Sequence, residues 1–257
     1  MSIKSTPPVV SFKAKELSKW KLPKVTSLKS MFYDVKFFEE NLSTWDVSNI
    51  TTMKWAFGGT KVRGVSKWKM PKVTNMAGMF YMWAADEDLS EWSGNMLKVT
   101  SMTYMFYNSK SFTGKGLSKW DVSNATAMGS MFKSTNVFNA DITKWDVAKV
   151  TGMSSMFEST KAFNQDISEW NVANVRSMSG MFMTAKVFSQ DLSKWDVSKV
   201  TDMYVMFSGA LEFYQVLCGE PWVKAWENRN VEKKEMFHYH TPGYISETCG
   251  VCFINIV

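Results

Sequence analysis

One tryptophan recurs along most of this chain at an almost constant interval. Such a fixed period, between about 20 and 50 residues, is typical of proteins built from stacked repeats. The chain therefore contains eight copies of one unit, and any fold has to accommodate all of them in the same way. The eight are Trp20, Trp45, Trp68, Trp92, Trp120, Trp145, Trp170 and Trp195, separated by 25, 23, 24, 28, 25, 25 and 25 residues.

Each copy repeats the same apolar positions relative to its tryptophan. In most copies valine stands two residues later, valine or isoleucine five later, methionine eight and eleven later, and phenylalanine twelve later. From the fifth position onward this spacing predicts one apolar face of a short helical turn. Threonine at the sixth position would cap that turn. The stretch before the tryptophan, NQDISEW at 164–170, has room for one short strand.

A unit of about 25 residues cannot bury its own apolar face, so the copies must stack on one another. The sequence predicts an α/β repeat solenoid with one short parallel strand and one short helical turn in each repeat. We expect an N-terminal segment over 1–14, the eight repeats over 15–213, and a C-terminal cap over 214–257. In the cap, Met236 and Phe237 after Trp226 predict a degenerate ninth repeat. The fourth copy carries two extra residues and should bulge.

The later copies share a distinctive repeat sequence. The stretches FNQDISEWNVANVRSMSGMF at 163–182 and FSQDLSKWDVSKVTDMYVMF at 188–207 resemble the repeat of BspA-like bacterial surface proteins, which are related to leucine-rich repeats. The resemblance covers residues 15–213, although Lys21 and Lys69 replace the aspartate in two early copies. It implies a leucine-rich-repeat-like solenoid that serves in surface display, adhesion or partner binding, at the cell surface or outside the cell.

The first twenty residues contain no apolar block followed by a cleavage site, as a signal peptide would. Nor does any stretch approach the roughly 18 consecutive apolar residues of a membrane span. An intracellular or virion-associated location is therefore the alternative to the surface location that the resemblance implies.

Lysine recurs at the residue before the tryptophan. The chain carries a net charge of +6, and residues 1–135 hold 19 basic against 10 acidic side chains. A row of lysines would attract an acidic ligand, whereas the favoured alternative is a solvated face that discourages edge pairing. We expect a protein or glycan ligand, including acidic ones, and no specific nucleic acid. The candidate row is Lys19, Lys67, Lys119, Lys144 and Lys194.

The other repeated residues are predicted to serve the fold. Fourteen of the 20 methionines occupy two repeat positions, which favours core packing over soft-metal binding. The tryptophans are expected to be packed, with each indole N–H bonded locally, rather than to form a sugar-binding strip. The recurrent aspartates are expected to form turns with their own backbone rather than to bind calcium.

The tail holds all three cysteines of the chain. A disulfide from Cys218, with Cys249 as the candidate partner, would close a loop of about 30 residues and stabilise the cap by roughly 3–4 kcal/mol. A second interpretation is that the cysteine thiols are free and buried. A zinc site built from Cys249, Cys252 and His238 is a third and less favoured one.

No catalytic motif is present: the chain has two histidines, both in the tail, and no nucleophile elbow, phosphate-binding loop or zinc-protease motif. We therefore predict a non-enzymatic surface-type repeat protein, without a cofactor, that binds a protein or glycan partner. The alternative is a structural building block of an envelope, wall or virion assembly.

Overall fold

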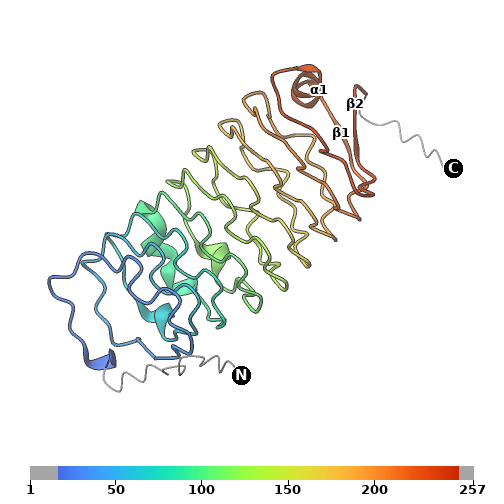
Figure 1. Ribbon diagram of the computed structural model, residues 1–257. Helices are drawn as coiled ribbons and strands as arrows, with labels where there is room; N and C mark the ends of the chain where they lie inside the picture. The colour runs from blue at the N-terminus through green and yellow to red at the C-terminus, as the bar shows by residue number, and fades with distance from the viewer. Residues whose placement is uncertain (1–16, 249–257) are drawn as a thin grey trace, which may run out of the picture.

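The computed structural model describes residues 17–248, which wind back and forth in an elongated stack of similar coils (Figure 1). Regular elements are short. The first four are 3-10 helices: η1 (Leu17–Lys19), η2 (Val65–Lys67), η3 (Ser90–Lys98) and η4 (Leu117–Lys119). At the C-terminal end lie the parallel strands β1 (Val216–Cys218) and β2 (Tyr244–Ser246), with the helix α1 (Glu220–Glu227) between them in sequence.

Corresponding residues of successive copies lie directly beside one another. Isolated parallel bridges join the seventh residue after each tryptophan to its counterpart in the next coil, from Ser27 with Thr52 through to Ser177 with Asp202. Here and below, positions in the fourth coil are counted without its two extra residues. One further bridge, between Asp202 and Glu232, carries the same alignment into the C-terminal cap. Each coil therefore contacts mainly the coil before it and the coil after it.

The bridged segment, residues 127–135 in the fifth copy, has an unusual hydrogen-bond pattern, and we call it the ladder segment. The N–H groups of Met128, Ser130, Phe132 and Ser134 donate to carbonyls of the next coil at 2.8–3.1 Å. The intervening N–H groups of Met131, Lys133 and Thr135 donate to the carbonyl three residues earlier in their own coil. The segment is thus a chain of overlapping turns that bonds alternately to itself and to its neighbour.

Two residues in every ladder segment adopt a left-handed backbone conformation. In the fifth copy they are Ser130 (φ 55°) and Ser134 (φ 61°), each at the third position of one of the overlapping turns. A turn with positive φ at this position is of type II, and the repeated turns explain why the conformation recurs. The tenth-position residues are Ser30, Trp55, Gly78, Tyr104, Ser130, Ser155, Gly180 and Val205.

These observations correct the predicted local structure. The segment expected to form a helical turn is the ladder segment, and it is no helix because half of its N–H groups bond the next coil. The stretch NQDISEW forms no strand. The threonine at the sixth position does not cap a helix. Its hydroxyl instead donates to a carbonyl of the preceding coil, as Thr51 does to Thr26 at 3.0 Å and Thr151 to Thr126 at 3.3 Å.

The predicted core is confirmed. Seven of the eight repeat tryptophans, all but Trp20, are at most 4% exposed. Neighbouring rings stack, for example Trp120 and Trp145 with centroids 6.4 Å apart and planes 4° from parallel. Each buried indole N–H donates to a backbone carbonyl of the preceding coil at 2.7–3.2 Å. Thirteen of the fourteen repeat methionines are also buried, and Met31 in the first coil is the exception at 39% exposed.

The predicted aspartate turns are confirmed as well. Asp196 accepts the backbone N–H of Ser198 at 3.0 Å, and Asp166 accepts that of Ser168 at 3.0 Å. Hydrogen bonds from these serines hold the pKa of both carboxyls below the ordinary value. The carboxylate oxygens thus satisfy the turns of their own chain.

The cap contains a ninth copy, but its tryptophan is Trp222 rather than the predicted Trp226. The indole N–H of Trp222 donates to Leu192 at 3.0 Å, as the seven buried repeat tryptophans do to their preceding coils, and the ring is fully buried. Trp226 is 44% exposed. The sequence suggested Trp226 because it precedes Met236 by nearly the usual interval. In the structure, Trp222 lies within α1, and the interval from it to the Met-Phe pair is longer than in the other copies.

Candidate binding surface

Five aromatic side chains from the first four coils gather on the outer side of the ladder segments. They occupy the tenth and thirteenth positions after the tryptophan, whose side chains point away from the core. We name this group the aromatic platform. Its members are Tyr33, Trp55, Tyr81, Tyr104 and Tyr107, of which Tyr33 is 47% and Tyr104 39% exposed while the others are half-buried.

The rings of the platform form one connected group. Trp55 lies at its centre, with ring centroids 5.7 Å from Tyr33, 5.3 Å from Tyr81 and 5.9 Å from Tyr104. Tyr107 extends the group by stacking on Tyr81 at 4.9 Å. Because corresponding residues of adjacent coils lie roughly 4.8 Å apart, the platform offers rings along four successive coils.

Glycine makes room for the platform rings. A Cβ atom on Gly78 would lie 2.2–2.5 Å from three atoms of the six-membered ring of Trp55. Such close approach to several ring atoms means that one face of the indole rests on the glycine backbone, which leaves the opposite face turned outward. A Cβ on Gly58 would likewise lie 2.8 Å from the Tyr33 ring. Trp55 therefore lies flat against the surface, while the rings of Tyr33 and Tyr81 are steeply inclined to its ring, at 83° and 66°.

The polar atoms of the platform are available to a ligand. Within residues 17–248, neither the Trp55 indole N–H nor the hydroxyl of any platform tyrosine has a hydrogen-bond partner, in contrast to the bonded indoles of the core. Burial raises the pKa of the Tyr81 hydroxyl, and the neighbouring Tyr107 and Tyr33 add to the effect. This hydroxyl is therefore neutral at pH 7 and can both donate and accept a hydrogen bond.

Across its third and fourth coils the platform carries no charge. In the third and fourth coils the outward positions nine, ten and thirteen hold alanine, glycine, threonine and tyrosine. Lys29 and Lys54 lie at one end. At the other end Lys133 sits 5.9 Å above the Tyr107 ring, and its ammonium group pairs with the buried carboxylate of Glu158 at 2.7 Å. An uncharged aromatic surface thus has modest positive charge at its rim.

The five predicted binding lysines do not form an uninterrupted cationic row. All five are exposed, as expected. The same repeat position holds Glu91 in the fourth coil and Glu169 in the seventh, and Glu169 forms an ion pair with Lys194. The negative charges of these two glutamates weaken the attraction of the row for a polyanion. The row is Lys19, Lys67, Lys119, Lys144 and Lys194.

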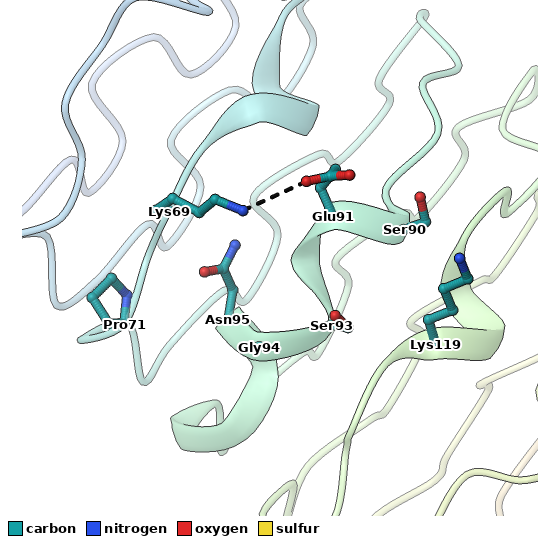
Figure 2. Close-up of a pocket in the computed structure, with 8 residues that line it drawn as sticks. All are labelled: Lys69, Pro71, Ser90, Glu91, Ser93, Gly94, Asn95 and Lys119. Atoms are coloured by element: carbon teal, nitrogen blue, oxygen red, sulfur yellow. Dashed lines mark ion pairs between the residues drawn. The ribbon is translucent and has the colours of Figure 1, made fainter.

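A polar hollow of about 530 Å³ lies beside η3, where the fourth copy was predicted to bulge (Figure 2). Lys69 and Glu91 approach within 3.6 Å across it, and Lys119 lies at its far side. The amide of Asn95 is occupied by the fold, because it accepts the N–H of Met70 at 2.8 Å and donates to Trp68 at 2.9 Å. The hollow is therefore a consequence of the inserted residues, with one cation already paired.

Only part of the predicted tail chemistry falls on described residues. Cys218 is disulfide-bonded. Cys249 and Cys252 lie outside the described residues, so the Cys218–Cys249 pairing stays a prediction. His238 lies 3.9 Å from a carboxylate oxygen of Glu235. Over residues 17–248 no group of three or more histidine, cysteine, aspartate or glutamate side chains is arranged to hold a metal ion.

The sequence reasoning missed the aromatic platform. It considered only residues that recur in every copy, and these serve the core. The available signal was the opposite one: at the tenth and thirteenth positions, each of the first four copies holds at least one tyrosine or tryptophan, whereas the later copies hold no aromatic residue there. Departures from the repeat, rather than the repeat itself, marked this surface.

Comparison with known proteins identifies one family. Residues 5–115 and 141–242, most of the chain, match the family described as Mycoplasma protein of unknown function, DUF285. Neither the curated proteins nor the solved structures include a match to the chain. Among residues 17–248, none of the helices has the length and apolar character needed to cross a membrane.

Proposed function

Because this chain belongs to the DUF285 family, whose description assigns no function, we propose a function from its surface: a non-enzymatic repeat protein that binds a protein or glycan partner through the aromatic platform. The observation that carries the proposal is the platform itself. Solvent-accessible tyrosine and tryptophan side chains with unused polar atoms are enriched where proteins bind partners.

The organisation of the repeats supports this assignment. The tryptophan, methionine, threonine and aspartate columns are used by the core and by the contacts between coils, which leaves partner recognition to the outward positions. The stacking of like residues also supports a leucine-rich-repeat-like class. Together with the resemblance to bacterial surface repeats, it favours a place at the cell surface or outside the cell.

The platform also lacks the groups that acid–base catalysis requires. Its polar atoms are phenol hydroxyls and one indole N–H, and Glu158, the carboxylate beyond Tyr107, is paired with Lys133. General acid–base catalysis needs a group that titrates near the working pH and lies close to the reacting atoms. A role in binding therefore fits these side chains better than a role in catalysis.

The repeat supplies a matched variant for the test. Serine occupies the tenth position in three other coils, at Ser30, Ser130 and Ser155, with the same backbone conformation. The double variant Trp55→Ser, Tyr104→Ser should therefore fold normally while it loses the centre of the platform. We expect at least tenfold weaker binding to an array of immobilised mannan, hydroxyethylcellulose, heparin, mucin and collagen, because buried aromatic anchors commonly contribute more than about 1.4 kcal/mol.

The control is Tyr214→Ser, which removes a 67% exposed tyrosine outside the platform and should leave binding unchanged. The proposal fails if the protein binds none of these ligands, or if the double variant binds them as well as the unchanged protein. Ordered assembly that grows with protein concentration, and that the double variant retains, would instead support the structural building block.

A further inference from the structure

We propose that the ligand of the aromatic platform is an uncharged polysaccharide chain that lies along the stack of coils. The inference rests on the proposed function and names the chemistry of the partner. It follows from three properties of the platform: the orientation of its rings, their repetition from coil to coil, and the absence of charge across its third and fourth coils.

The ring faces fit the apolar side of a sugar. Trp55 lies with one face on Gly78, and Tyr104 lies beside it with the two ring planes 28° apart. The Trp55 and Tyr104 rings thus offer stacking surface 5.9 Å apart, whereas Tyr33 and Tyr81 meet Trp55 edge-on at 83° and 66°. The C–H groups on one side of a pyranose ring carry small positive charge, and an aromatic face carries negative charge, so the two surfaces attract when stacked.

The repetition of the rings suits a polymer. Tyr33, Trp55, Tyr81 and Tyr107 come from consecutive coils, and contacting rings along this series are 4.9–5.7 Å apart. A chain of sugars that follows the stack would meet a new ring at each coil. A polymer of identical sugars can use this regular spacing along its whole length.

The unused polar atoms complete the match. A neutral sugar exposes hydroxyl groups around the edge of its apolar face, and each hydroxyl both donates and accepts. The four tyrosine hydroxyls and the Trp55 indole N–H surround the platform with partners of this kind, and no described residue occupies them. Direct or water-mediated hydrogen bonds to these groups would orient the chain.

The charge distribution disfavours an anionic polymer. Proteins that bind single-stranded nucleic acid combine stacking rings with a positively charged groove along the backbone. Here Lys29 and Lys54 belong to the first two coils, the outward positions of the third and fourth coils are uncharged, and Lys133 is paired with Glu158. A polyanion would find a cation at few of its repeating charges, whereas an uncharged chain needs none.

Affinity electrophoresis tests the inference. The protein is run in native gels cast with hydroxyethylcellulose, mannan or dextran, and separately in gels with heparin or poly(dT). We expect at least one neutral polysaccharide to retard the protein and the retardation to persist at about 1 M salt, where the Debye length is about 3 Å. The Trp55→Ser, Tyr104→Ser variant should show at least tenfold less retardation than the unchanged protein. Tyr214→Ser should show the same retardation as the unchanged protein.

Two further variants separate stacking from hydrogen bonding. Tyr104→Phe should retain most of the retardation, because it keeps the ring, and Gly78→Ala should reduce it, because the added methyl group displaces the Trp55 ring. Circular dichroism confirms that each variant is folded. Retardation of folded Gly78→Ala equal to that of the unchanged protein would contradict the role given to the ring.

The inference is overturned if none of the neutral polysaccharides retards the protein. It is also overturned if retardation occurs only with heparin or poly(dT) and disappears in high salt, since the ligand would then be anionic. Suppose that no neutral polysaccharide binds, but that the unchanged protein binds mucin or collagen in the array and the platform variant does not. The proposed function then stands, while an uncharged polysaccharide is rejected as the ligand.

Discussion

At the level of single residues, the tenth position shows how one backbone conformation accommodates different uses. All eight residues there have positive φ, although only two are glycine. A left-handed residue with a side chain costs roughly 1–2 kcal/mol, because Cβ approaches the following carbonyl. Trp55 and Tyr104 adopt this unfavourable conformation, and their side chains form part of the platform. Val205, β-branched and at φ 47°, has no such use in the structure.

We expect Val205→Gly to raise the free energy of unfolding by about 0.5–1 kcal/mol. Glycine relieves the strain at positive φ, and its greater freedom in the unfolded chain offsets part of the gain. Gly180 already occupies this position in the preceding coil. Denaturation in urea measures the change. As a control, Val187→Gly changes an exposed valine outside the left-handed set and should destabilise the protein; equal effects of both changes would contradict the argument.

At the level of the element, each coil is closed by turns that its aspartates stabilise. Hydrogen bonds from serine or threonine lower the pKa of Asp46, Asp88, Asp121, Asp141, Asp166 and Asp196. A carboxyl whose pKa is lowered by folding stabilises the protein above its unfolded pKa. That stabilisation is lost as the pH falls through the folded pKa.

The thermal midpoint should therefore fall as the pH is lowered from about 5 to below the ordinary aspartate pKa of 3.8. Asp196→Asn keeps an oxygen that accepts the Ser198 N–H, as Asn171 does for Ala173 in the preceding coil. We expect this variant to be slightly less stable at pH 7 and to match the unchanged protein at low pH. Calorimetry across this range checks it; a difference independent of pH would mean that the charge of Asp196 is irrelevant.

At the level of the whole molecule, stability is distributed along the stack through contacts between neighbouring coils. The central coils are well buried, for example Trp170 at 3% and Met181 at 0% exposed. The first coil is more open, with Trp20 at 45%, Met31 at 39% and Phe37 at 61% exposed. Stacked repeats of this kind open from their less protected coils, because each interface contributes its own share of the free energy.

Amide hydrogen exchange should therefore be at least tenfold faster in the ladder segment of the first coil, residues 27–35, than in those of residues 152–185. A tenfold difference corresponds to about 1.4 kcal/mol of local opening free energy. Mass spectrometry of peptides from both regions measures the rates. Uniform protection along the chain would show that the coils open as one unit instead.

The sequence by itself determined the register of the repeats. Tryptophan, methionine and turn-forming aspartate recur at set intervals. Identical units bury their apolar faces only when corresponding residues of neighbouring units lie over one another. The buried indoles, the buried methionines and the aspartate turns could therefore be predicted. The mixed charge at the exposed lysine position could also be predicted, because the sequence places Glu91 and Glu169 there.

Only the tertiary structure decided the conformation of the ladder segment and the existence of the platform. The apolar spacing is compatible with a helix, but hydrogen bonds to the next coil replace those that a helix would make within itself. Trp55 meets Tyr33, Tyr81 and Tyr104 across more than twenty residues of sequence, so their contact exists only after the coils stack. Local sequence pattern sets what each coil buries, whereas the stack sets which outward side chains become neighbours.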